Sequence, residues 1–310
     1  MGPPAFFIDT IQIDLTYRCN FGCPYCYNPP DVSTWKYNLK KEEISSVIDQ
    51  ALELGIRKFL FLGGEPTLHR DLAESIRYVR NRCSDAGTLV STNGSRLDKD
   101  FIFALADAGL DTISFSIHLE PLNRDRQFDF GDLNKLLDDY IQRIRIAKNA
   151  GLTTYSTVAF TRQYYPFILT ILNRLLAESP VDSVGLEYFF MAGHGAKRPD
   201  LVPTPQQVNA IYDDVRGLEQ RYGSQRVEYC ARHVYLEAGQ RSHYTNPSLA
   251  VYNQSQIVVN PWGDVLPEPQ ATDALEVARL GNIKEEPLRV CIERYHVRLM
   301  EHGVAIQPVQ

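Results

Sequence analysis

The sequence lacks the features that mark membrane proteins, secreted proteins and nucleic-acid-binding proteins. No apolar run is long enough to span a bilayer, and the residues from Met1 to Ala5 carry no positive charge ahead of an apolar segment. Lys and Arg form no run, and 32 of them stand against 38 Asp and Glu, which gives a net charge of −6. We therefore expect a cytoplasmic protein that binds neither membranes nor nucleic acid.

Cysteine is scarce, and its distribution is uneven. Of six cysteines in 310 residues, three lie within eight residues of one another, at Cys19, Cys23 and Cys26. The others are scattered, at Cys83, Cys230 and Cys291. A secreted disulfide framework would be denser and would extend through the chain, whereas three close thiols in a cytosolic protein favour metal binding.

Strands and helices alternate through the first two-thirds of the chain. Apolar patterns predict strands over 11–16, 58–62, 88–92, 112–117, 153–160 and 183–190. Between them they predict helices from about residue 40 and over 71–83, 98–108, 132–149 and 166–178. Six such units indicate an α/β fold with a parallel sheet, and they fit a (β/α)6 partial TIM barrel because a complete barrel needs eight. Ligands of these folds bind at the carboxyl ends of the strands.

The pattern changes after Gly193. A linker rich in Gly and Pro precedes a helix with Thr204 as N-cap and Gly223 as terminator, and two short strands flank a Pro/Gly turn within 256–266. We therefore predict a barrel domain over 1–195, followed over 196–310 by the linker helix and a smaller α+β cap.

The three close cysteines follow the first predicted strand directly, spaced C-x3-C-x2-C. Three thiolates in a short loop suit a soft metal centre, and an iron–sulfur cluster normally takes four. No fourth cysteine lies nearby, so one iron of such a cluster would stay open to an external ligand, as in catalytic metal sites. A structural zinc site that borrows a distant histidine, or a group of buried thiols, would also give this pattern.

This loop resembles the signature of radical S-adenosylmethionine (radical SAM) enzymes. In that family, three cysteines hold a [4Fe-4S] cluster in a (β/α)6 partial barrel, and the open iron binds the amino and carboxylate groups of S-adenosylmethionine (SAM). Further motifs follow in order at the next strand ends and extend the resemblance over about residues 8–195. They are Gly63-Gly64-Glu65-Pro66, which resembles the family's GGEP motif, Ser91-Thr92-Asn93-Gly94, Ser114-Phe115-Ser116-Ile117, and Arg126 beyond them.

The resemblance implies a role for each of these residues. Cys19, Cys23 and Cys26 would hold the single cluster, and Glu65 with the carbonyls of Gly63 and Gly64 would bind the methionine ammonium. Donors to the methionine carboxylate and the ribose would be Ser91, Asn93, Ser116 and Arg126, and Tyr25 would lie beside the adenine. Taken singly, these residues have plainer explanations. Glu65 could be a surface carboxylate, Ser91 and Ser116 could cap strand ends, and Arg126 could be a solvated charge.

The fourth-strand motif departs from the family at His118. Many relatives have Asp after the Ser-x pair, whereas this chain continues with Ile117 and His118. We therefore predict His118 as a catalytic residue that faces the substrate at the barrel mouth. A loop histidine without a task is the alternative.

The last third resembles the SPASM/twitch extension of the same superfamily, over 256–265 and 280–288. That extension usually binds auxiliary iron–sulfur clusters through four or more cysteines. Here Glu268 stands where a cysteine is expected, and only Cys230 and Cys291 remain in the region. We therefore predict that the extension has lost its auxiliary clusters.

The predicted activity is reductive cleavage of SAM to a 5′-deoxyadenosyl radical that abstracts a hydrogen atom from a biosynthetic substrate. The substrate would be a peptide or an aminosugar-like small molecule, and a flavodoxin or ferredoxin would supply electrons. Without an auxiliary cluster as electron acceptor, we expect a redox-neutral or thiol-quenched reaction, an epimerisation or a rearrangement. Cys230 is the candidate hydrogen donor, unless it is a small buried hydrophobe. Alternatives are a radical SAM dehydrogenase, a bond-forming peptide maturase and a non-enzymatic iron–sulfur or zinc scaffold.

Overall fold

The structure is a computed structural model of the whole chain, and it describes residues 8–28, 36–119, 130–189, 191–229, 255–268 and 278–301. Two compact units make up the chain, and neither is continuous in sequence. Unit 1 comprises 1–19, 28–89 and 243–310, and unit 2 comprises 20–27 and 90–242. The division predicted between residues 195 and 196 stays a prediction. Within the described residues, no helix is both long and apolar enough to cross a membrane.

The sheet of unit 1 is built around its first strand. β1 (Thr10–Thr16) runs parallel to β2 (Lys58–Gly63) on one side and to β8 (Gln256–Val259) on the other. Antiparallel strands β9 (Asp264–Leu266) and β10 (Gly281–Asn282) continue from β8. The strands predicted over 11–16 and 58–62 and around the turn within 256–266 are confirmed. The pairing of β8 with β1 was not predicted, because alternating apolar residues identify a strand but not its partner.

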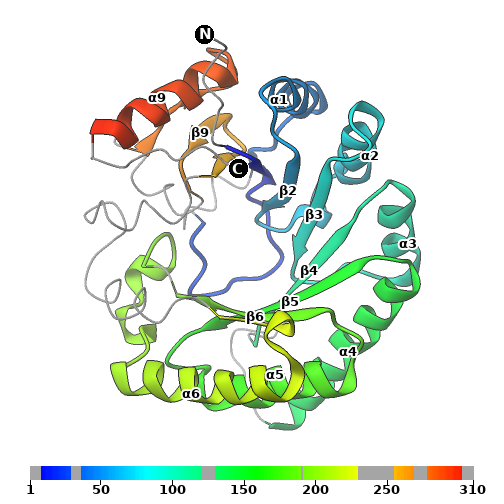
Figure 1. Cartoon of the computed structure of the whole chain (residues 1–310), viewed down its shortest axis with the longest axis vertical. Helices are drawn as coiled ribbons and strands as arrows, with labels where there is room; N and C mark the ends of the chain where they lie inside the picture. Colours follow the sequence, from blue (N-terminus) through cyan, green and yellow to red (C-terminus); the bar gives the residue numbers. More distant parts are fainter. Residues whose placement is uncertain are drawn as a thin grey trace. The chain divides into compact units, whose positions relative to one another are not determined.

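The helices of unit 1 bury one apolar face each. They are α1 (Lys41–Glu53), η2 (Pro66–Leu68), α2 (Leu72–Arg82) and α9 (Leu288–Glu301), and Figure 1 shows α1 close to β2. In α1 the buried residues are Ile44, Val47, Ile48 and Ala51, at the spacing of a single helix face. The helix stops before Gly55, whose φ of +87° lies in the left-handed region that glycine tolerates best.

Unit 2 repeats the strand–helix alternation with parallel strands. β4 (Thr112–Ile117), β5 (Thr153–Phe160), β6 (Ser183–Tyr188) and β7 (Val227–Tyr229) pair in that order. Its helices are α3 (Lys99–Asp107), α4 (Phe130–Asn149), α5 (Tyr165–Glu178) and α6 (Pro205–Tyr222), with short turns η3 (Gly195–Lys197), η4 (Pro199–Leu201) and η5 (Ser224–Arg226). Figure 1 shows α4, α5 and α6 along one side of these strands. β3 (Gly87–Thr92) passes from unit 1 into unit 2 between Leu89 and Val90.

Helix α6 begins as its sequence predicts. The backbone N–H of Gln207 donates to the Thr204 hydroxyl at 3.2 Å, and the side chain of Gln207 accepts from the backbone N–H of Thr204 at 2.9 Å. Pro205 occupies the first turn, where a backbone N–H has no helical partner to lose. Gly223, with φ +95°, follows the last residue of the helix. The linker helix is therefore confirmed.

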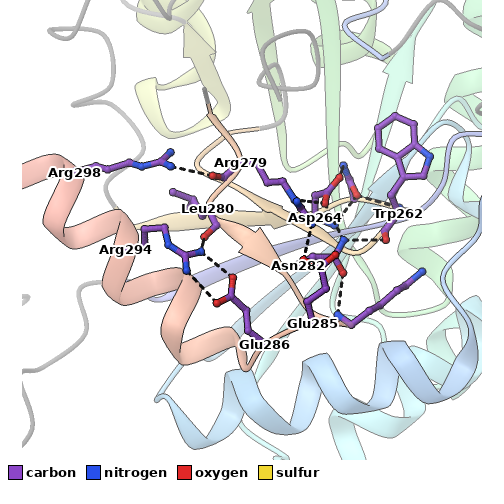
Figure 2. Close-up of polar contacts among 11 residues, drawn as sticks. Trp262, Asp264, Arg279, Leu280, Asn282, Glu285, Glu286, Arg294 and Arg298 are labelled. Atoms are coloured by element: carbon purple, nitrogen blue, oxygen red, sulfur yellow. Dashed lines mark hydrogen bonds and ion pairs between the residues drawn. The ribbon is translucent and has the colours of Figure 1, made fainter. Parts of the chain in front are cut away.

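The C-terminal residues of unit 1 are tied together by their own polar side chains (Figure 2). Asp264 accepts from the Nε of Arg279 at 2.6 Å and from the Nδ2 of Asn282 at 2.8 Å. Arg294 forms a two-pronged ion pair with Glu286, at 2.8 and 3.0 Å, and also donates to the carbonyl of Leu280. Charged hydrogen bonds of this kind hold the loops around β9 and β10 in one arrangement.

Cys291 lies on α9 beside this network. Its side chain is buried, its Sγ lies 3.8 Å from the Pro287 carbonyl, and burial raises the pKa of the thiol to about 11. At neutral pH the group is therefore a neutral thiol in this structure. The absence of auxiliary clusters from the extension stays a prediction.

A buried polar ladder crosses β8 and β1. Gln256 donates to Gln12 at 3.1 Å, and Gln12 donates to the Oδ1 of Asp14 at 2.8 Å. Asp14 is 1% exposed, and its Oδ2 has no hydrogen-bond partner. Burial raises the pKa of this carboxyl to about 7, against a smaller lowering by the Gln12 hydrogen bond.

Replacing Asp14 by asparagine is expected to remove a pH dependence of stability. Between about pH 4 and 7, folded Asp14 keeps a proton that the unfolded chain releases, so the free energy of unfolding falls as pH rises, by at most about 1.4 kcal/mol per pH unit. The amide of the variant would still accept from Gln12 but would not titrate. Anaerobic unfolding of wild type and Asp14→Asn at pH 5 and pH 8 measures this, and equal pH profiles would contradict it.

Candidate functional site

The cysteine loop follows β1 and passes from unit 1 into unit 2 after Cys19. None of its three cysteines forms a disulfide; Cys23 is buried, and Cys19 and Cys26 are half-buried. Within unit 2 the backbone N–H of Cys26 donates to the carbonyl of Cys23 at 3.2 Å, and the N–H of Gly195 donates to the carbonyl of Cys26 at 3.2 Å. The loop is thus a fixed turn that carries sulfur donors, the ligand type of an iron–sulfur cluster.

The thiols do not converge on one point. Over the described parts of the chain, no three side chains of His, Cys, Asp or Glu come close enough together to hold a single metal ion. A cluster spreads its thiolates over separate irons, so these residues fit a cluster by number, type and spacing.

An asparagine clamp joins the cysteine loop to the end of β3 in unit 2. The Nδ2 of Asn93 donates to the Oδ1 of Asn20 at 3.0 Å, and the Nδ2 of Asn20 donates to the hydroxyl of Ser95 at 2.8 Å. The Oδ1 of Asn93 accepts from the backbone N–H of Ser95 at 2.9 Å. Asn93, a predicted SAM contact, is 5% exposed, and its amide bonds to Asn20 of the loop and to Ser95 in this structure.

Two predicted SAM contacts meet at neighbouring strand ends of unit 2. The hydroxyls of Ser91 on β3 and Ser116 on β4 lie 3.3 Å apart, and both side chains are half-buried. Tyr140 from α4 braces these ends, since its hydroxyl donates to the carbonyls of Asn93 at 2.8 Å and Ser116 at 3.0 Å. The pair of serines offers two rotatable donors in one place.

His118 turns toward the cysteine loop. Its Nδ1 lies 2.7 Å from the hydroxyl of Tyr25 and 3.4 Å from the Sγ of Cys23. Although the ring keeps some contact with solvent, its packing against the loop desolvates it and lowers its pKa to about 4. Desolvation therefore favours the neutral imidazole, and the contact of His118 with a substrate stays a prediction.

In unit 1 the Gly63-Gly64-Glu65-Pro66 segment packs on the end of β1. The backbone N–H of Gly64 donates to the carbonyl of Thr16 at 2.7 Å, and that of Glu65 donates to the carbonyl of Arg18 at 2.8 Å. A Cβ on either glycine would overlap these carbonyls, and Gly63 has φ +125°. The glycines are thus required for the approach of two backbones, in addition to any approach to a ligand.

Glu65 is a buried carboxylate held in place by its own turn. It is 1% exposed, and its Oε1 accepts from the hydroxyl of Thr67 at 2.5 Å and from the backbone N–H of Thr67 at 3.1 Å. Nearby, the Nδ2 of Asn28 donates to the carbonyl of Gly63 at 2.9 Å. A fixed buried carboxylate beside strand-end carbonyls is suited to bind an ammonium group.

Four supporting residues were not predicted: Asn20, Asn28, Thr67 and Tyr140. Asn20 and Asn28 are polar residues beside the cysteines, so their position in the chain marks them. Tyr140 lies within a helix far away in sequence, and no local pattern identifies it. Two predicted site residues, Arg126 and Cys230, lie outside the described residues.

The comparisons with known proteins agree with these motifs. The family model of the radical SAM superfamily matches residues 13–164. The chain belongs to this superfamily. A "PqqA peptide cyclase" from Xanthomonas oryzae pv. oryzae is 25% identical over 283 residues, which cover 90% of this chain and 72% of that protein.

Solved structures show the same fold. SuiB from Streptococcus suis, bound to its precursor peptide SuiA, has a TM-score of 0.72 at 16% identity and covers 97% of this chain and 68% of its own. The same protein bound to SAM has a TM-score of 0.68 at 15% identity, with 97% and 67% covered. The prediction of an α/β fold of the partial TIM-barrel type is therefore confirmed, and the cofactors of the family are a [4Fe-4S] cluster and SAM.

Proposed function

We propose that this radical SAM enzyme modifies a peptide. The observation that carries the proposal is the alignment with a PqqA peptide cyclase, which extends over 90% of the chain and so includes residues beyond the barrel motifs. The fold shared with SuiB, a structure solved with a precursor peptide, supports it. The enzyme would act in the cytoplasm, with a flavodoxin or ferredoxin as electron donor.

Each residue of the site has a part in this proposal. Cys19, Cys23 and Cys26 would hold the cluster, and the cluster would supply the electron that splits SAM into methionine and a hydrogen-abstracting 5′-deoxyadenosyl radical. Glu65, whose position Thr67 fixes, pairs with the methionine ammonium. Donors for the carboxylate and ribose are Ser91, Asn93, Ser116 and Arg126, Tyr25 borders the adenine, and Gly63 and Gly64 offer their carbonyls.

The fate of the substrate radical depends on the hydrogen source. Only two cysteines follow residue 195, which is too few for a four-cysteine auxiliary cluster. We propose that the thiol of Cys230 returns a hydrogen atom to the substrate carbon. The resulting thiyl radical then takes one electron from the donor protein and one proton from solvent before the next turnover. The outcome is an epimerised or rearranged peptide of unchanged mass.

The experiment uses anaerobic, reconstituted protein with SAM, a reductant and the short peptides encoded beside its gene. In deuterated water we expect 5′-deoxyadenosine together with a peptide that gains a single carbon-bound deuterium, because thiol hydrogens exchange with solvent. Cys230→Ala should still form 5′-deoxyadenosine but lose the deuterated product, whereas Cys83→Ala should match wild type.

Other outcomes separate the alternatives. A peptide that loses two hydrogens would identify a dehydrogenase or a bond-forming maturase and overturn the thiol-donor step. Formation of 5′-deoxyadenosine with no change in any peptide, but with turnover of an aminosugar, would overturn the peptide assignment. No 5′-deoxyadenosine under any reducing condition would leave a scaffold protein.

A further inference from the structure

We propose that His118 is a positioning residue of the cluster, whose Nδ1–H donates a hydrogen bond to the sulfur of Cys23 and raises the reduction potential of the cluster. The inference concerns residues of unit 2 alone and rests on the assignment of Cys23 as a cluster ligand. It gives a role to the residue at which the fourth-strand motif departs from the family.

Alternate residues of the cysteine loop hold the imidazole. The Tyr25 ring stacks on it, with centroids 5.9 Å apart and planes 23° apart, and the Phe21 ring meets it edge-on at 5.7 Å. Between them, the Sγ of Cys23 lies 3.4 Å from Nδ1. Because Phe21, Cys23 and Tyr25 all contact one ring, its orientation is determined by the loop. A loop histidine without a task would not need these contacts.

The chemistry of the partners selects one tautomer. An iron-bound cysteine sulfur is a thiolate, which accepts hydrogen bonds and donates none. A lone pair on Nδ1 would face that negative sulfur, so the favourable form carries the hydrogen on Nδ1. The Tyr25 hydroxyl, 2.7 Å away, then accepts from the same N–H. The Tyr164 hydroxyl, which donates to the Tyr25 oxygen at 3.5 Å, is consistent with that oxygen as an acceptor.

A hydrogen bond to a ligand sulfur affects the two redox states of a cluster unequally. The reduced cluster carries one more negative charge, so a donor at the sulfur stabilises it more than the oxidised cluster. His118 therefore makes reduction easier, and reduction precedes every turnover of a radical SAM enzyme. Removing the donor should lower the midpoint potential.

Three substitutions separate the donor from the packing of the ring. His118→Phe keeps a ring against Tyr25 but has no donor. His118→Asn places an amide nitrogen on Cγ, where Nδ1 is bonded, and so keeps a donor near the sulfur. His118→Gln places its amide nitrogen one atom further out, near the position of Nε2, and serves as the matched control for His118→Asn.

The measurement is the midpoint potential of the cluster, from a redox titration followed by electron paramagnetic resonance (EPR) without SAM. At the wild-type midpoint, we expect His118→Phe and His118→Gln to hold about tenfold more oxidised cluster per reduced cluster, a shift of about 59 mV for one electron. His118→Asn should stay close to wild type. Iron and sulfide contents confirm that each variant is loaded, and if His118→Phe does not load, the Asn and Gln variants decide.

Two results would overturn the inference. Unchanged potentials in all variants would show that His118 does not affect the cluster. A shift in both His118→Asn and His118→Gln with a wild-type potential in His118→Phe would show that only ring packing matters. Wild-type protein that forms no SAM-responsive cluster would instead contradict the proposed function, so the two failures are distinguishable.

Discussion

Cys23→Ser is expected to abolish formation of 5′-deoxyadenosine, with a loss of roughly a thousandfold or more, because every later step depends on the cluster. A serine hydroxyl is a hard, weakly acidic donor and does not replace a thiolate on iron. Cys23 is the most buried cysteine of its loop. Iron and sulfide analysis of the anaerobically reconstituted protein should show a parallel loss of bound iron.

Cys83→Ser is the matched control for this variant. Cys83 is a half-buried free thiol at the end of α2, and its Sγ donates to Asp85 at 2.9 Å, as a serine hydroxyl also would. The variant should keep the iron content and activity of wild type. Wild-type activity in Cys23→Ser, or an equal loss in both variants, would contradict the assignment of the loop as the cluster site.

Gly64→Ala is expected to destabilise unit 1 by more than about 3 kcal/mol, beyond the usual cost of overpacking. The added Cβ would lie 2.6 Å from the carbonyl oxygen of Tyr17 and 2.7 Å from the carbonyl carbon of Arg18. These are backbone atoms, so no rotamer change relieves the contact. The substitution would also displace Glu65, whose N–H bonds to the Arg18 carbonyl, and should weaken SAM binding.

Gly217→Ala controls for the loss of a glycine as such. Gly217 lies in α6 with nothing within 4 Å of an added Cβ, so alanine should raise stability by about 0.5–1 kcal/mol. Anaerobic denaturant unfolding of the two variants and titration with SAM measure both effects. A stable Gly64→Ala protein with wild-type affinity for SAM would contradict the described packing of the Gly63-Gly64 segment.

The elements of the fold were largely predictable from local patterns. The strands over 112–117 and 153–160 match β4 and β5 residue for residue, and the cap of α6 at Thr204 follows from its own sequence. The pairing of strands was harder to predict. β8 and β7 are short, and each pairs with a strand that lies far away in the chain. The alternation of apolar residues shows which face of a strand is buried, but it does not show which strand lies beside it.

Candidate site residues could be predicted where they belong to a local sequence motif. Contacts made by residues far away in the chain could not be predicted. The cysteine spacing and the glycine-rich segment are local patterns, and they are enough to predict the loop and Glu65 as candidate site residues. The environment of His118 was not predictable, since it depends on how the loop folds over the end of β4. The same holds for the bracing hydroxyl of Tyr140, which is 24 residues from Ser116 and 47 from Asn93.

The central claim is that three cysteines leave one iron of a [4Fe-4S] cluster open, and that SAM binds there. EPR spectra of reduced, anaerobically prepared wild-type protein, recorded before and after addition of SAM, test it most directly. We expect the signal of a reduced [4Fe-4S] cluster whose shape changes when SAM is added. A cluster signal whose shape does not change when SAM is added, or protein that holds zinc in place of iron, would contradict the account.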